Sequence, residues 1–103
     1  MEWFSVYLQA RNPADTPAPD EAAVTKLVDL LEPYDGIVTA GTGSWEATIS
    51  IRAMKLATAA KIGQEVIQAN ALKALIPMWP PVRVEAVRHD VLAERLQGSG
   101  DRG

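Results

Sequence analysis

The sequence predicts an α+β domain in which two helices cover one face of a four-stranded antiparallel sheet. The clearest observation is the alternation over Ser44–Arg52, which is typical of a strand with one buried face. Its apolar positions share that face: Trp45, Ala47, Ile49 and Ile51. Residues 2–9 alternate in the same way, and each half of the chain contains a segment in which apolar residues recur at helical spacing.

The first half of the chain predicts a strand and a helix. The strand spans residues 2–9, with Phe4, Val6 and Leu8 on one face and Trp3, Ser5 and Tyr7 on the other. The proline-rich run from Arg11 to Asp20 is expected to be a loop, because proline fixes φ and lacks a backbone donor. A helix follows over about residues 20–32, with Asp20 as its N-cap or first-turn acid and Pro33 as its stop. Its apolar positions are Val24, Leu27, Val28 and Leu31.

The second half predicts a hairpin, a helix and a strand. A short strand at 37–40 is joined to the strand at 44–52 by Gly41-Thr42-Gly43-Ser44, since glycine tolerates the positive φ of tight turns. A helix is expected from about Ala57 to Leu75, ended by Pro77, with Ala60, Ile62, Val66, Ile67 and Ala74 as its apolar side. The connector 78–81 leads to a last strand, in which Val82, Val84 and Ala86 alternate with Arg83, Glu85 and Val87.

The resulting order, β-α-β-β-α-β, is the ferredoxin-like arrangement, with two helices on one face of the sheet. A short C-terminal helix is expected at His89–Leu96, so the domain spans residues 1–97 and residues 98–103 form a flexible tail. The sheet face away from the helices is expected to be mixed polar and aromatic. It carries Trp3, Ser5, Tyr7, Glu46, Thr48, Ser50, Arg52, Arg83, Glu85 and Val87.

Length and composition limit the classes of protein to which the chain can belong. A chain of 103 residues fits one domain, and it contains no cysteine for a disulfide, a thiolate zinc site or a cysteine nucleophile. The N-terminus shows no signal peptide and no apolar run is long enough to span a bilayer, so a cytoplasmic protein without a membrane partner is expected. The formal net charge of −3 argues against direct nucleic-acid binding by this domain.

The residues that resemble catalytic or ligand-binding motifs have simpler interpretations. Gly41–Ser44 resembles part of a phosphate loop, but phosphate loops precede a helix and here a strand is expected. His89 and Asp90 could be a base or a metal pair, yet one histidine cannot build a zinc site alone, and a surface histidine is favoured. Glu46 and Glu85 could form a carboxylate pair, which Arg52 and Arg83 are expected to neutralise.

No catalytic, cofactor-binding or metal-binding residue is therefore predicted, and the chain is not expected to be an enzyme. Aromatic residues on a sheet face can also bind RNA bases, but that platform needs aromatics on the third strand too, where the positions on the same face are Glu46, Thr48 and Ser50. The exposed sheet face predicts protein–protein interaction instead, with a homodimer or another protein as partner. The candidate interaction residues are Trp3, Tyr7, Thr48, Ser50, Arg52 and Arg83.

Several motifs resemble a family of small actinobacterial proteins, often described as helix-turn-helix regulators or as uncharacterised. The similar stretches are GSWEATISI and IPMWPPVRVEAVRHDVLAERL, and the residues that carry the resemblance are Trp45, Pro77, Trp79, Pro80, Glu85 and Ala86. It extends over roughly Trp3 to Leu96. Members commonly continue into a DNA-binding helix-turn-helix, which this sequence does not contain.

The resemblance implies a non-catalytic domain for dimerisation or sensing, like the N-terminal domain of a transcriptional regulator. If the chain is whole, it is a standalone module; if it is a fragment, the DNA contacts lie outside it. Two other functions remain open. One is a structural or assembly protein of an actinobacterial phage or prophage, and the other is a small dimeric α+β barrel enzyme or ligand sensor.

Overall fold

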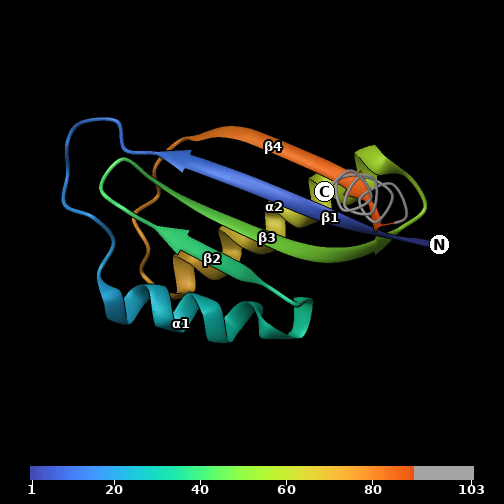
Figure 1. The fold of residues 1–103 in the computed structure, drawn as a ribbon, viewed down its shortest axis with the longest axis horizontal. Helices are drawn as coiled ribbons and strands as arrows, with labels where there is room; N and C mark the ends of the chain where they lie inside the picture. Colours follow the sequence, from blue (N-terminus) through green and yellow to red (C-terminus); the bar gives the residue numbers. More distant parts are fainter. Residues whose placement is uncertain (90–103) are drawn as a thin grey trace, which may run out of the picture.

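A computed structural model describes residues 1–89 and confirms the α+β class. The four strands form one sheet, and Figure 1 shows the long helix behind it and the shorter helix along one side. The elements are β1 (Glu2–Arg11), α1 (Glu21–Leu31), β2 (Ile37–Ala40), β3 (Ser44–Ala53), α2 (Leu56–Lys73) and β4 (Pro81–Arg88), with a 3-10 turn at Glu32–Tyr34. Of the terminal helix expected at His89–Leu96, only His89 lies within the described residues, and the tail 98–103 lies outside them.

The sheet is antiparallel throughout, with strand order β2-β3-β1-β4. β1 and β3 pair along their full lengths, from Glu2 opposite Ala53 to Arg11 opposite Ser44. Because each strand supplies the hydrogen-bonding partners of the other, both extend slightly beyond the alternating stretches seen in the sequence. β4 pairs with the free side of β1, and β2 with the free side of β3, which places β1 and β3 at the centre.

The alternation in β1 and β3 correctly predicted the core. Every second residue of these strands is buried, and Val6 and Leu8 have no exposed surface. The largest fully buried side chain is that of Trp45, which is 2% exposed and donates a hydrogen bond from Nε1 to the carbonyl oxygen of Pro77 at 3.2 Å. This indole therefore joins the start of the central strand β3 to the connector that follows α2.

The first helix lies close to its expected bounds. Leu27 and Leu31 are fully buried, as the helical spacing predicted, but Val28 is 40% exposed. Val28 follows Leu27 by one residue, a rotation of about 100°, which turns it away from the sheet. Asp20 occupies the N-cap position, and its side chain makes no capping hydrogen bond.

Of the residues expected on the apolar side of the second helix, Ile67 and Ala74 are buried, but the rest of the buried stripe differs from the expected one. Its buried residues are Ala59, Gly63, Ile67 and Ala71, spaced four apart along one side, whereas Ile62 is 37% exposed. α2 contacts β1, β3 and β4, and α1 contacts β2 and α2, so both helices cover the same face of the sheet. The small residues let the helix lie close to the strands. A Cβ atom added at Gly63 would come within 2.5 Å of Val6 Cγ1.

The end of α2 is set by backbone geometry before Pro77 is reached. The helix stops at Lys73, and Leu75 adopts a left-handed φ of 64°. The amide of Ile76 bonds to the carbonyl of Ala71 at 2.9 Å, and that of Leu75 to Leu72 at 3.1 Å. These bonds form a Schellman motif, in which the left-handed position usually holds glycine. The expected helix therefore ends two residues early.

Leu75→Gly is expected to raise the free energy of unfolding by about 1 kcal/mol, because the left-handed conformation costs a side-chain-bearing residue about that much. Leu75 is 82% exposed, so little packing is lost with its side chain. Leu72→Gly is a matched control inside α2 and should lower the same quantity by just under 1 kcal/mol, since glycine disfavours helix. Urea titrations of both variants measure the two effects. An unchanged or lower stability in Leu75→Gly would contradict the strain argument.

The expected hairpin between β2 and β3 is present, but not for the expected reason. The amide of Gly41 bonds to the carbonyl of Ser44 at 2.9 Å and closes the connection. No glycine among residues 1–89 has a positive φ, so Gly41 and Gly43 do not serve as left-handed turn residues. β3 follows directly, and the segment is not placed before a helix as a phosphate loop would be.

The loop before α1 is fixed by one asparagine. Asn12 Nδ2 donates hydrogen bonds to the carbonyl oxygens of Thr16 and Thr42, and Asn12 Oδ1 accepts from the Thr16 amide and hydroxyl. The buried indole of Trp79 donates to Thr16 Oγ1 at 3.2 Å. The proline-rich loop, the β2–β3 hairpin and the connector after α2 are thereby joined at one end of the sheet.

Candidate functional site

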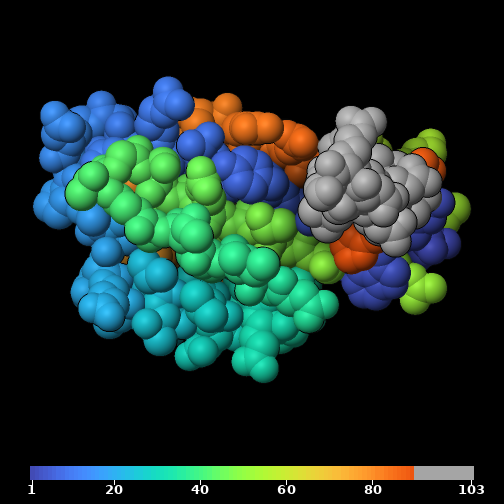
Figure 2. Space-filling view, in the orientation of Figure 1, coloured from blue at the N-terminus to red at the C-terminus, as the bar shows by residue number. Residues whose placement is uncertain are grey.

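The sheet face opposite the helices is the candidate site, and it is called the open face below. In the view of Figure 2 the strands form the surface, and α2 lies behind them. Strand register places polar and aromatic residues on this face in successive rows. It contains Trp3, Ser5, Tyr7 and Gln9 of β1, Glu46, Thr48, Ser50 and Arg52 of β3, Arg83, Glu85 and Val87 of β4, and Ile37 and Thr39 of β2.

All six candidate interaction residues share the open face. Trp3 pairs with Arg52, and Tyr7 pairs with Thr48 on one side and Glu85 on the other. Ser50 is opposite Ser5, and Arg83 is opposite Gln9. The alternation therefore identified which side chains lie together, although no binding role follows from the placement itself.

The Trp3 end of the open face includes a residue that the sequence had not placed there. Trp3 is 51% exposed, and the His89 ring stacks on it with centroids 6.4 Å apart and planes 21° apart. His89 Nε2 is 3.5 Å from Ser50 Oγ. His89 continues the period of Arg83, Glu85 and Val87, and this signal could have assigned it to the open face.

The centre of the open face is an aromatic and ionic cluster around Tyr7. The Arg83 guanidinium lies 5.4 Å from the centroid of the Tyr7 ring and forms a 2.7 Å ion pair with Glu85. Partial burial, followed by interaction with the Glu46 carboxylate, raises the pKa of the Tyr7 phenol. Hydrogen bonding to Glu85 raises the pKa of Arg83. Tyr7 is therefore a neutral phenol at physiological pH, with a cation beside its ring.

The charges on the open face are only partly neutralised. Arg83 pairs with Glu85 as expected, whereas Glu46 interacts with the neutral Tyr7 phenol and accepts a long hydrogen bond, 3.4 Å from the Thr39 hydroxyl. Within the described part of the chain, neither Glu46 nor Arg52 forms an ion pair. These two residues are six positions apart on β3, or about 20 Å, so they cannot neutralise each other within one molecule.

The described residues do not form a recognisable catalytic arrangement. The contact between Ser50 and His89 is long for a hydrogen bond that activates a nucleophile, and both groups lie on an open surface. No group of three or more potential metal ligands occurs within residues 1–89. In the same part of the chain, no helix is both long and apolar enough to cross a bilayer.

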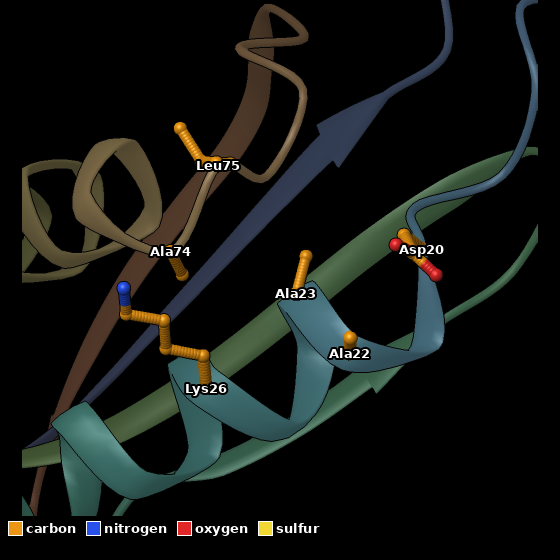
Figure 3. Close-up of a pocket in the computed structure, with 6 residues that line it drawn as sticks. All are labelled: Asp20, Ala22, Ala23, Lys26, Ala74 and Leu75. Atoms are coloured by element: carbon orange, nitrogen blue, oxygen red, sulfur yellow. The ribbon is translucent and has the colours of Figure 1, made fainter.

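A hollow of about 240 Å³ lies between the start of α1 and the end of α2. Figure 3 shows Lys26 reaching towards Ala74, with Asp20 at the far end of the hollow. Alanines and Leu75 form most of its wall, so it lacks the several convergent polar groups that fix a substrate. Its volume is also below the roughly 300–1,000 Å³ of typical ligand sites.

Comparisons with known proteins add no assignment. No family model, curated protein or solved structure matches this chain significantly. The resemblance to actinobacterial regulators therefore stays a prediction from the sequence.

Proposed function

We propose that this chain is a non-catalytic interaction module with a ferredoxin-like fold that forms a homodimer through its open face. The observation that carries the proposal is the half-exposed Trp3 on a sheet face that neither helix covers. The strand order β2-β3-β1-β4 and the position of both helices on one side support the ferredoxin-like assignment.

The chemistry of the open face suits a partner that is itself a folded protein. Tryptophan, tyrosine and arginine are the residues that most often dominate binding energy at protein interfaces, and Trp3, Tyr7 and Arg83 provide one of each. Burying the exposed half of Trp3 would contribute on the order of 1 kcal/mol from area alone. Polar side chains around these residues, including Thr48 and Ser50, can form the hydrogen-bonded rim of such an interface.

The resemblance noted above suggests where such a dimer would be used. We propose the role of a dimerisation or sensing domain of an actinobacterial transcriptional regulator, acting in the cytoplasm. DNA contacts would then come from another segment or partner. The open face itself carries both signs of charge, with Arg83 already paired to Glu85, and so lacks a continuous basic surface for phosphates.

Combined Trp3→Ala and Tyr7→Glu substitutions are expected to convert a dimer of about twice 11.1 kDa to a monomer. The first removes the exposed indole, and the second places an uncompensated charge at the centre of the interface. Sedimentation equilibrium over a range of protein concentrations measures the mass. Circular dichroism checks that the variant is folded.

A matched control carries Leu72→Ala and Lys61→Glu, which change one exposed apolar and one exposed charged residue on α2. The control should keep the mass of the wild-type protein. A wild-type chain that remains monomeric at all concentrations would refute the proposed dimer, and an unchanged dimer in the Trp3 and Tyr7 variant would refute the open face as its interface.

A further inference from the structure

The two ends of β3 present opposite charges on the open face. Arg52 is at one end, beside Trp3, and Glu46 is at the other, beside Gln9. Neither forms an ion pair within residues 1–89, whereas Arg83 and Glu85 are already paired with each other. A surface with separated, unpaired charges of opposite sign can be complementary to a second copy of itself.

We propose that two copies pair open face to open face with their β3 strands antiparallel, so that Arg52 of each copy meets Glu46 of the other. This inference rests on the proposed homodimer and specifies its geometry. A two-fold axis that runs across the strands exchanges the two ends of each strand. It therefore places the Arg52 end of one sheet over the Glu46 end of the second sheet, and the symmetry repeats the pair.

The same rotation places the other central residues of the open face in favourable positions. Residues that are register partners on neighbouring strands form a row across the sheet, and the axis lies above the row of Val6 and Ile49. The row that contains Trp3 in one copy then covers the row that contains Gln9 and Arg83 in the second copy. A guanidinium over an indole face is a favourable contact. The alternative two-fold axis, parallel to the strands, would stack the two Arg52 ends on each other and is disfavoured by repulsion between like charges.

The size of the open face sets the strength expected of this dimer. Four strands about 4.8 Å apart and about seven residues long give a flat area on the order of 400 Å². Stable interfaces bury about 800 Å² per partner, so this pairing should be reversible and dependent on protein concentration. Because its charged pairs lie near the ends of the interface, added salt should weaken it.

Charge exchange tests the arrangement directly. Arg52→Glu and Glu46→Arg are each expected to raise the dimer dissociation constant about tenfold, because each replaces two symmetric attractions by two repulsions. The double variant restores opposite charges at both ends and should return to within about threefold of the wild type. Sedimentation velocity at low ionic strength measures all three dissociation constants, and Lys61→Glu on α2 serves as the control for net charge.

The possible outcomes separate this inference from the proposed homodimer. If the dimer dissociation constant of the double variant is as high as that of the single variant that dimerises more weakly, the antiparallel arrangement is wrong. A wild-type dimer would still support the open face as an interface. If the wild type does not dimerise, both proposals fail. Glu46→Gln provides a milder change should Glu46→Arg unfold the monomer, and it should weaken the dimer without creating repulsion.

Discussion

Trp45→Ala is expected to lower the free energy of unfolding by about 3–5 kcal/mol, the largest effect of any substitution considered for this domain. Trp45 is 2% exposed and lies at the hairpin end of the central strand β3, so its removal leaves a cavity that the surrounding strands and helices cannot fill. The total stability of a domain of this size is about 5–15 kcal/mol, and this single change would remove a large part of it. Urea titration followed by circular dichroism measures the loss.

Trp45→Phe separates packing from hydrogen bonding at the same position. It keeps an aromatic ring and removes the Nε1 donor, but the carbonyl of Pro77 retains its second hydrogen bond, from the Trp79 amide at 2.8 Å. A smaller loss of about 1–2 kcal/mol is therefore expected. Equal losses for Trp45→Phe and Trp45→Ala would show that the hydrogen bond, rather than the volume of the indole, dominates.

Gly63→Ala is expected to lower the free energy of unfolding by about 1–3 kcal/mol, although alanine is the better helix former. The new Cβ would lie 2.5 Å from Val6 Cγ1 and 2.6 Å from Val6 Cβ. Because Val6 is fully buried in the central strand, α2 would have to move away from the sheet. The same urea titrations measure the change.

Two controls isolate the steric effect at Gly63. A Cβ added at Gly43 meets nothing within 4 Å, and its φ is not positive, so Gly43→Ala should be nearly neutral. Ala69→Gly on the exposed side of α2 should cost about 1 kcal/mol and calibrates helix propensity in this helix. A Gly63→Ala variant that is more stable than the wild type would mean that α2 does not approach the sheet this closely.

The strands were readable from the sequence because each has one apolar and one polar face. The alternation around Ile49 and Phe4 identified both the core and the open face. The helix α2 was harder to read, since its buried stripe includes Ala59, Gly63 and Ala71, whose small side chains give little hydropathy contrast. Ile62 is more hydrophobic than these three residues, but it is partly exposed. The helix packs closely against the sheet mainly through small side chains, so residue size and not hydropathy alone decides which side of α2 is buried.

The end of α2 and part of the candidate site depended on information that local patterns do not contain. Leu75 takes a left-handed conformation in which glycine would be expected, so the sequence suggested Pro77 as the stop. His89 has the helical conformation expected of it directly after β4, but its ring contact with Trp3 of β1 could not be predicted from local patterns. The six candidate interaction residues do share one face, and the dimer experiments test whether this face binds a second copy of the chain.

The central position of β1 has a consequence for how the chain folds as it is synthesised. β1 is made before both of its neighbours, β3 and β4, which lie at residues 44–53 and 81–88. Its backbone donors and acceptors on the β4 side stay unsatisfied by the sheet until residues 81–88 have been made. A nascent chain that stalls before β4 thus presents a long apolar strand edge, the kind of surface at which incomplete chains associate with each other.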